Sequence, residues 1–331
     1  MRYYNIPIFV PHYGCPFDCV FCNQKHITGE KDKPSGARTK EIIEEYLVTL
    51  PKDNRCIEAA FFGGSFTAVE VELQEELLQA AYEFVKDGRI DGIRLSTRPD
   101  FIDEAVMARL MKYGVTSIEL GVQSMDDGVL LASGRGHTAD DVEKAVEIIK
   151  KYPIKTGLQM MTGLPGDTDE KSLATAEKII ALSPDFVRIY PTLVIRDTRL
   201  CDMYRDGTYK PQSLDSAVSL AAKLMELFRR NNITVIRAGL ATTEEISPGG
   251  ALVAGPYHSA FGELAEGEIF YNRIKTVLSD SKTAEIAVNP RDISKAVGNR
   301  RKNIERFKEE GCLVHFVQDE GVAQGEIKRK D

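Results

Sequence analysis

Short apolar runs alternate along the first 240 residues with longer segments whose apolar positions recur at helical spacing. The runs predict strands at 5–10, 58–62, 92–95, 117–120, 155–160 and 186–190, with a possible seventh at 234–237. Strands and helices in strict alternation predict a parallel sheet with helices outside it. Eight such units close a full barrel. Six or seven units therefore predict an α/β fold over residues 1–240, a partial, open (β/α)6 barrel.

Polar residues before three helical segments predict where those helices begin. Thr138 and Asp141 have the spacing of a capping box. Asp167 and Glu170 have the same spacing before the next helix, and Thr39 is expected to cap a helix that starts at residue 40.

Residues 241–331 are predicted to form a small α+β extension. A stretch rich in Gly, Pro and Ser over 243–262 is expected to be a loop that could cover the barrel mouth. Helical spacing follows over 262–278, and the order strand, helix, helix, strand is expected over 285–331.

Composition and charge narrow the function classes only slightly. The chain lacks an apolar run long enough to span a bilayer, and its first residues lack signal-peptide architecture. We therefore expect a cytoplasmic protein without a membrane partner. The net charge of −7 argues against a broadly basic surface for nucleic acid, while a local basic patch remains possible.

A cluster of three cysteines carries the strongest chemical signal. Cys15, Cys19 and Cys22 are spaced C-x3-C-x2-C, and Phe21 precedes the last of them. Thiolates are the usual ligands of iron–sulfur clusters, and three ligands on a four-iron cluster leave one iron open. A structural zinc site is the alternative, with His12 or His26 as the fourth ligand.

This motif resembles the signature of the radical S-adenosylmethionine (SAM) enzymes, C-x3-C-x-aromatic-C. The resemblance implies a [4Fe–4S] cluster bound by the three cysteines, with SAM chelated by the open iron. It also implies reductive cleavage of SAM to a 5′-deoxyadenosyl radical, which needs an external one-electron donor such as flavodoxin or ferredoxin.

The resemblance also implies a cofactor site at the carboxyl ends of the strands, where α/β barrels place their chemistry. In the family, a double glycine binds the SAM amino group, and a Gln and an Arg contact the ribose and the carboxylate. Ser96 stands where many relatives have Glu, and Gln159 where some have Asp or His. Ordinary turns, a solvated Arg135 and a buried Gln159 are the alternatives. The expected cofactor residues are Phe21, Gly63, Gly64, Ser65, Ser96, Gln123, Arg135, Gln159 and Tyr190. A catalytic residue acting on the substrate is not predicted.

Several longer segments are similar to the radical domain of the catalytic subunit of Elongator, which modifies the wobble uridine of transfer RNA. They include 63–67, 97–100, 119–124, 135–138, 160–166 and 189–194. Elongator-type enzymes differ in a wider gap between the first two cysteines and in a following acetyltransferase domain. Carboxymethylation of uridine in the Elongator manner is therefore not implied.

A basic segment near the C-terminus suggests RNA contact. Six basic residues and one acidic residue lie between Lys295 and Lys308, and the segment is similar to the nucleic-acid-binding KH motif, with Arg301 in place of its second glycine. The candidate RNA contacts are Lys295, Arg300, Arg301 and Lys302. A solvated helix face explains them equally well. We therefore expect an enzyme that modifies transfer RNA. The alternatives are a radical SAM enzyme for a small metabolite or peptide, and a non-catalytic RNA-binding protein with a structural metal site.

Overall fold

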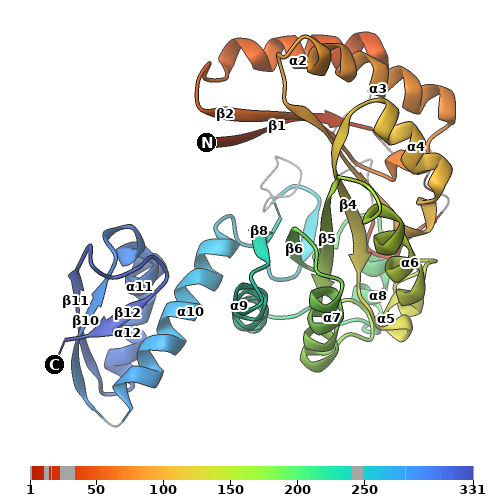
Figure 1. Ribbon diagram of the computed structural model, residues 1–331. Coiled ribbons are helices and arrows are strands. Elements are labelled where there is room, and N and C mark those ends of the chain that lie inside the picture. Colours follow the sequence, from red (N-terminus) through yellow and green to blue (C-terminus); the bar gives the residue numbers. More distant parts are fainter. Residues whose placement is uncertain are drawn as a thin grey trace.

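The fold is built around a seven-stranded parallel sheet. The structure, a computed structural model, describes residues 2–10, 15, 17–22, 34–240, 249–279 and 281–330. The strands lie in the order β1-β2-β3-β4-β5-β6-β8, and the sheet curls without pairing its two edges (Figure 1). Their bounds are β1 Arg2–Phe9, β2 Arg55–Phe62, β3 Gly92–Thr97, β4 Val115–Gln123, β5 Lys155–Thr162, β6 Phe186–Pro191 and β8 Thr234–Ala238. The predicted open barrel is confirmed, and the possible seventh strand is present.

Helices connect the parallel strands. They are α2 Gly36–Thr49, α3 Val71–Lys86, α4 Glu104–Lys112, α5 Asp127–Ala132, α6 Ala139–Ile149, α7 Asp169–Ala181, α8 Arg199–Arg205 and α9 Leu214–Arg230. Among the helices and other segments that the structure describes, none is long and apolar enough to cross a membrane.

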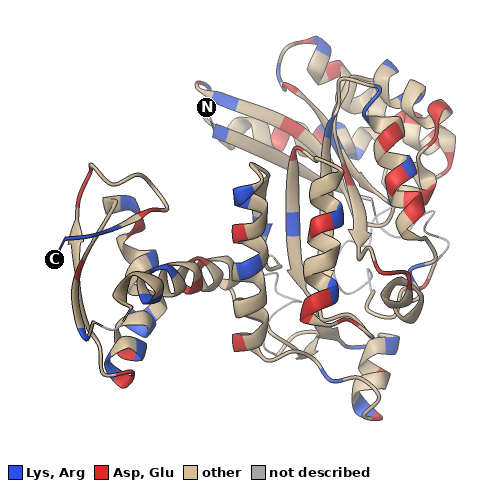
Figure 2. Cartoon of the chain, turned by 60° about the horizontal axis from the view of Figure 1, so that its bottom comes forward, with Lys and Arg blue, Asp and Glu red and all other residues tan. Residues whose placement is uncertain are grey.

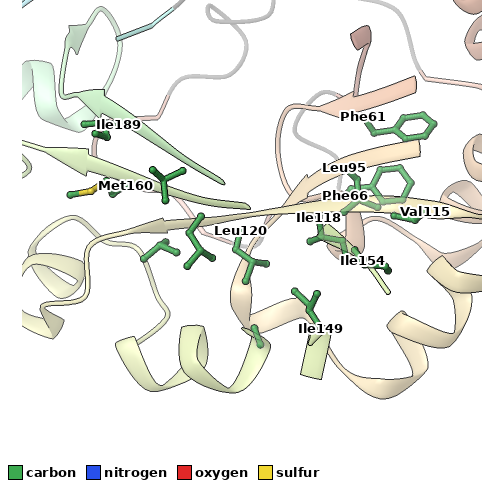
Figure 3. Close-up of a cluster of buried hydrophobic side chains, with 14 of the residues drawn as sticks. Phe61, Phe66, Leu95, Val115, Ile118, Leu120, Ile149, Ile154, Met160 and Ile189 are labelled. Carbon is green, nitrogen blue, oxygen red and sulfur yellow. The ribbon is translucent and has the colours of Figure 1, made fainter. Parts of the chain in front are cut away.

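The two faces of the sheet differ sharply in chemistry. Phe61, Leu95, Leu120, Met160 and Ile189 are almost fully buried in one apolar cluster with the helices (Figure 3). Successive strand residues point to opposite faces. The residues that alternate with this cluster therefore lie on the opposite face, which we call the inner face. They include Asn5, Glu58, Arg94, Ser96, Ser117, Glu119, Gly121, Gln159, Arg188, Tyr190 and Arg237.

Helix α10 (Phe261–Leu278) leads from the barrel into the C-terminal extension (Figure 1). Its first half, at Phe261, Ala265 and Ile269, belongs to the large barrel cluster. Its second half, from Phe270 onward, belongs to a separate cluster inside the extension. Because α10 serves both cores, the boundary expected at residue 240 stays a prediction.

The extension has a three-stranded sheet with two short helices. Its elements are β10 Thr283–Val288, α11 Ile293–Val297, α12 Lys302–Glu309, β11 Leu313–Gln318 and β12 Ile327–Arg329. Strand β10 lies in the middle, parallel to β11 and antiparallel to β12. The expected order strand, helix, helix, strand is present, and β12 is added to it. Part of the expected covering loop lies outside the described residues, and its end forms β9 (Leu252–Ala254), which pairs with β7 (Val194–Ile195).

The predicted helix starts are partly correct. Thr138 and Asp141 form the expected capping box of α6. The prediction for Thr39 is wrong, because α2 begins at Gly36, four residues before the expected start, and Ser35 caps it by accepting a hydrogen bond from the Arg38 amide. The earlier start is stabilised by a tertiary contact, since the Gly36 amide donates to the Glu76 carboxylate at 2.6 Å.

The cap of α7 differs from the expected residue by one position. Thr168, and not Asp167, accepts from the amide of Lys171. The Asp167 carboxylate instead accepts from the Gly163 amide at 2.8 Å and from the Ser172 hydroxyl at 2.7 Å. Asp167 thus joins the β5–α7 turn to helix α7. The spacing of Asp167 and Glu170 in the sequence is the same for this role as for capping.

Candidate active site

The cysteine loop follows β1 at the carboxyl edge of the sheet. Backbone hydrogen bonds join its two ends to neighbouring elements: the Val10 amide donates to Phe62 O at 2.7 Å, and the Val20 amide donates to Ser133 O at 3.0 Å. The carbonyl of Val20 also accepts a hydrogen bond from the Leu200 amide of α8 at 2.7 Å. The loop is therefore held by β2, by the α5–α6 connection and by α8.

Phe17 fixes the middle of this loop. The guanidinium of Arg98 lies over its ring, 4.1 Å from the ring centre. Gly136 also approaches the ring so closely that a Cβ there would lie 2.2 Å from it. Arg98 is 1% exposed and is itself held by two 2.9 Å hydrogen bonds to Asp100. An ion pair directly after β3, in which the arginine is buried, thus positions the residue between two of the cysteines.

The three thiols fit a cationic iron centre by their chemistry. Cys19 is buried, and Cys15 and Cys22 are partly buried. Burial, together with negative charge on Cys19 and Cys15, raises the pKa of Cys22 to about 12, while Arg135 opposes the rise. Thiolates gathered at such a site need a compensating cation. The described thiols are close enough to interact electrostatically, although their present arrangement is not that of a formed metal site. His12 and His26, the proposed zinc ligands, lie outside the described residues.

Arg135 reaches the cysteines from the α5–α6 connection. One terminal nitrogen donates to Gly121 O at 2.7 Å, and the other lies 3.7 Å from the Cys19 sulfur. A side chain at Gly121 would lie 2.8 Å from the guanidinium, so glycine makes room for it. Arg135 is buried, and its Nε lacks a hydrogen-bond partner among the described residues. A buried cation with a free donor fits an anionic ligand group such as the carboxylate that the sequence resemblance implies.

Gln123 and Gln159 form a reciprocal amide pair. Gln123 Nε2 donates to Gln159 Oε1 at 3.2 Å, and Gln159 Nε2 donates to Gln123 Oε1 at 2.9 Å. Gln123 is in the left-handed region, with φ +66°, where the β4–β5 register shifts. Such a conformation is unfavourable for a residue with a side chain and is concentrated at functional sites. The structure thus brings two expected cofactor residues into one polar unit.

The double glycine and Ser65 lie at the end of β2. Gly63 has φ +92°, and a Cβ there would come within 2.9 Å of Val10 O, so this position requires glycine. Gly64 is also left-handed, with φ +49°. The Ser65 hydroxyl is buried and hydrogen-bonded to the Thr97 hydroxyl at 2.9 Å. Ser65 therefore joins β2 to β3.

The other expected cofactor residues lie at neighbouring strand ends. Ser96 is partly exposed on the inner face. Tyr190, at the end of β6, accepts a hydrogen bond from Arg188 at 3.0 Å. Phe21 packs against a small apolar cluster formed with α8 that includes Val194 and Leu200.

Sequence reasoning missed Arg98 and His137 as parts of this site. His137 is buried with its Nε2 3.2 Å from Val122 O, and burial, together with Arg135 and Arg98, lowers its pKa to about 3. The neutral imidazole therefore lies close to the two buried guanidiniums. Both residues belong to sequence segments that resemble Elongator, at 97–100 and 135–138, and this resemblance could have identified them.

The structure separates the four basic residues of the C-terminal segment into two pairs. Lys295 forms an ion pair with Asp292 at 3.0 Å, and Lys302 forms one with Asp215 at 2.7 Å. Arg300 and Arg301 are exposed, and neither forms an ion pair with another described residue. Figure 2 shows basic and acidic residues interspersed in the C-terminal extension. Acidic partners thus neutralise two of the four residues, and the expected RNA contacts stay a prediction.

Residues 184–270 match the Radical SAM C-terminal domain, and residues 9–179, just over half of the 331 residues, match the Radical SAM superfamily. The chain is 26% identical over 248 residues to the tRNA uridine(34) acetyltransferase of Dehalococcoides mccartyi (strain CBDB1), which covers 64% of this chain and 54% of that protein. It is 31% identical over 192 residues to Elongator complex protein 3 of Saccharomyces cerevisiae, covering 52% and 34%, respectively.

The fold is similar to that of Methanocaldococcus infernus Elp3 with its N-terminus (1–46) deleted. The TM-score is 0.61 at 24% identity, and the match covers 81% of this chain and 67% of that one. The chain spans 54% of the Dehalococcoides relative and a smaller share of the yeast relative. The superfamily match includes the three cysteines and the strand ends from β2 to β5. The chain therefore belongs to the radical SAM superfamily, whose enzymes use a [4Fe–4S] cluster and S-adenosylmethionine.

Proposed function

We propose that this enzyme modifies a nucleoside of transfer RNA. The observation that carries the proposal is sequence similarity to proteins named tRNA uridine(34) acetyltransferase and Elongator complex protein 3, running through the barrel. The chain spans only part of those proteins, so the proposal concerns the RNA substrate and the radical step. It does not include transfer of an acetyl group.

The cofactor residues are proposed from their positions. Cys15, Cys19 and Cys22 would hold the cluster. The bound cofactors would supply a radical able to abstract hydrogen from the substrate. Arg135 would bind the SAM carboxylate through the donor that is free among the described residues, and Gly63 and Gly64 would let the backbone approach the amino group. The Gln123–Gln159 pair would present its remaining amide groups to the ribose.

We further propose a cytoplasmic location and an external electron donor such as flavodoxin or ferredoxin. The substrate class supports the location, and the reductive chemistry of the superfamily supports the donor. Ser65, Ser96, Phe21 and Tyr190 remain proposed cofactor contacts, and Ser65 would act through its backbone because its hydroxyl is engaged with Thr97.

The test uses anaerobically reconstituted protein with dithionite, SAM and bulk transfer RNA. We expect 5′-deoxyadenosine together with a changed nucleoside in the digested RNA, detected by mass spectrometry. The Cys19→Ala variant is the control and should produce neither. If 5′-deoxyadenosine forms while every nucleoside stays unchanged, transfer RNA is not the substrate, and a small metabolite or peptide becomes the better proposal.

Contact between the C-terminal extension and RNA is a separate part of the proposal. Arg300 and Arg301 have φ values of +51° and +63°, in the turn between α11 and α12. Their exposed side chains suit phosphate contacts. The Arg300→Ala/Arg301→Ala variant should weaken RNA binding and reduce the slope of log affinity against log salt by about two.

Lys302→Ala is the matched control for this variant because Lys302 already pairs with Asp215. Lys302→Ala should change the slope of log affinity against log salt by less than about one, the value expected for one lost phosphate contact. Lys295, which pairs with Asp292, is expected to behave like Lys302. An unchanged slope in the double arginine variant would mean that the turn is only a solvated surface.

A further inference from the structure

A group of charged side chains occupies the inner face of the sheet, next to the expected cofactor residues. Glu119 lies at its centre and is only 6% exposed. Arg94 from β3, Arg188 from β6 and Arg237 from β8 are all near enough to act electrostatically on its carboxylate. The cysteine chemistry and the expected SAM contacts described above leave these four residues without a role.

The arginines are incompletely paired. Arg188 Nε lies 3.0 Å from Glu119 Oε2, but the two atoms are misdirected for a hydrogen bond, and neither has another hydrogen-bond partner among the described residues. The polar contacts of Arg94 are long, at 3.7 Å to Glu58, 3.5 Å to Asn5 and 3.4 Å to Ser117, and its guanidinium also lies over the Phe186 ring, 5.0 Å from the ring centre. A native fold rarely leaves buried polar groups in this state without a reason.

The balance of charge in this group is positive. Three arginines face two carboxylates, those of Glu119 and Glu58. Burial raises the pKa of Glu119 and lowers the pKa of Arg94, because both charges are held away from water. Burying a guanidinium without a full partner is costly, and apolar residues could fill the same positions. The excess positive charge therefore fits an anionic ligand.

The position of the group fits a substrate site. In the sheet register, Gln159 pairs with Arg188, and Arg188 pairs with Arg237. Arg188 also donates to Tyr190, at the carboxyl end of β6. Arg188 and Arg237 thus lie in register with the expected cofactor residue Gln159, close to the carboxyl ends of their strands. Strand β8 is an edge of the sheet, and Arg237 on it is exposed, so a ligand can enter from that side.

We infer that Arg94, Arg188 and Arg237 form a subsite on the inner face that binds an oxyanion of the substrate. On the proposed RNA substrate, which this inference takes as its basis, the oxyanion is the phosphate of a nucleotide turned out of the strand. Extruding a nucleotide is the usual way for an enzyme to reach a base or sugar atom inside folded RNA or DNA. Arginine suits this task because its planar fork donates two hydrogen bonds to one phosphate.

The test measures binding to the reconstituted protein by calorimetry at low salt. The probes are uridine 5′-monophosphate, uridine, inorganic phosphate and succinate. We expect the monophosphate to bind at least tenfold more tightly than uridine, since a charged hydrogen bond changes affinity by roughly that factor or more. Arg237→Gln and Arg188→Gln should each remove about tenfold of this affinity.

Arg230→Gln, an exposed arginine at the end of α9, is the matched control and should bind like wild type. Arg188→Lys keeps the charge and serves if the glutamine variant fails to fold. The subsite would be overturned if wild type and the Arg188→Gln/Arg237→Gln variant bind the monophosphate equally well. The exception is a result in which succinate binds to wild type and more weakly to this variant. In that case the subsite stands and takes a carboxylate.

The outcomes also separate this inference from the proposed function. If the monophosphate binds through the arginines but transfer RNA is never modified, the subsite stands and the RNA proposal fails. If transfer RNA is modified equally well by wild type and by the double variant, the RNA proposal stands and the subsite is refuted.

Discussion

Gly136 offers the sharpest test of how the cysteine loop is held. In Gly136→Ala, the new methyl carbon would lie 2.2 Å, 2.3 Å and 2.7 Å from three carbons of the Phe17 ring. Nonbonded carbons prefer separations of about 3.5–4.0 Å, so the ring must move by about 1 Å or more. Arg98 packs over this ring, 4.1 Å from its centre, and restricts its retreat. Because Phe17 lies between Cys15 and Cys19, the displacement should reach the cluster ligands.

The expected cost has two parts. Gly136 has φ +75°, where alanine is less favourable than glycine by about 1–2 kcal/mol. Overpacking against the ring adds about 1–3 kcal/mol. We therefore expect unfolding in urea to show a loss of about 2–5 kcal/mol. Iron bound after reconstitution should also fall well below the wild-type amount.

Gly88→Ala is the matched control. Gly88 has φ +67°, but a Cβ there meets no atom within 4 Å. It should show only the backbone cost of about 1–2 kcal/mol and should bind iron normally. In Gly136→Ala, removing the ring with Phe17→Ala should restore part of the lost iron. If Gly136→Ala loads as much iron as Gly88→Ala, the packing of Phe17 does not position the cysteines.

Three further predictions concern neighbouring residues. Wild type should bind about four irons per chain, and Cys19→Ala should abolish both iron binding and 5′-deoxyadenosine formation. Arg135→Ala should weaken SAM binding by about 2 kcal/mol in equilibrium dialysis with the iron content retained, and Arg135→Lys should not restore it, since the planar fork is lost. His137, with a pKa of about 3 when folded against about 6.5 unfolded, favours unfolding as pH falls. From pH 7 to pH 5, wild type should lose about 2 kcal/mol more stability than His137→Asn.

The barrel could be predicted because the apolar spacing of a strand and that of a helix are each visible within a short stretch of sequence. Strands such as β5 and helices such as α9 each show their own apolar spacing, and alternation of the two dictates a parallel sheet. The three cysteines and the double glycine could be found for the same reason, since each motif lies within a few residues.

Contacts between distant segments could not be predicted in this way. The Gln123–Gln159 pair depends on a shift in the β4–β5 register, and the position of Phe17 depends on Arg98 and Gly136. The basic segment seemed to lack partners because Asp215, which binds Lys302, is 87 residues away in the sequence. Likewise, the arginines of the inner face are spread over three strands and converge only through the fold.

Helix α10 has a consequence for how the protein can be divided and how it unfolds. Side chains of its first half pack in the barrel core and those of its second half pack in the core of the extension, so both cores contain side chains of one continuous helix. A truncation at residue 240 would remove Phe261, Ala265 and Ile269 from the barrel and expose the apolar surface that they cover. The two cores are therefore thermodynamically coupled, and heating should melt them in one cooperative transition rather than two.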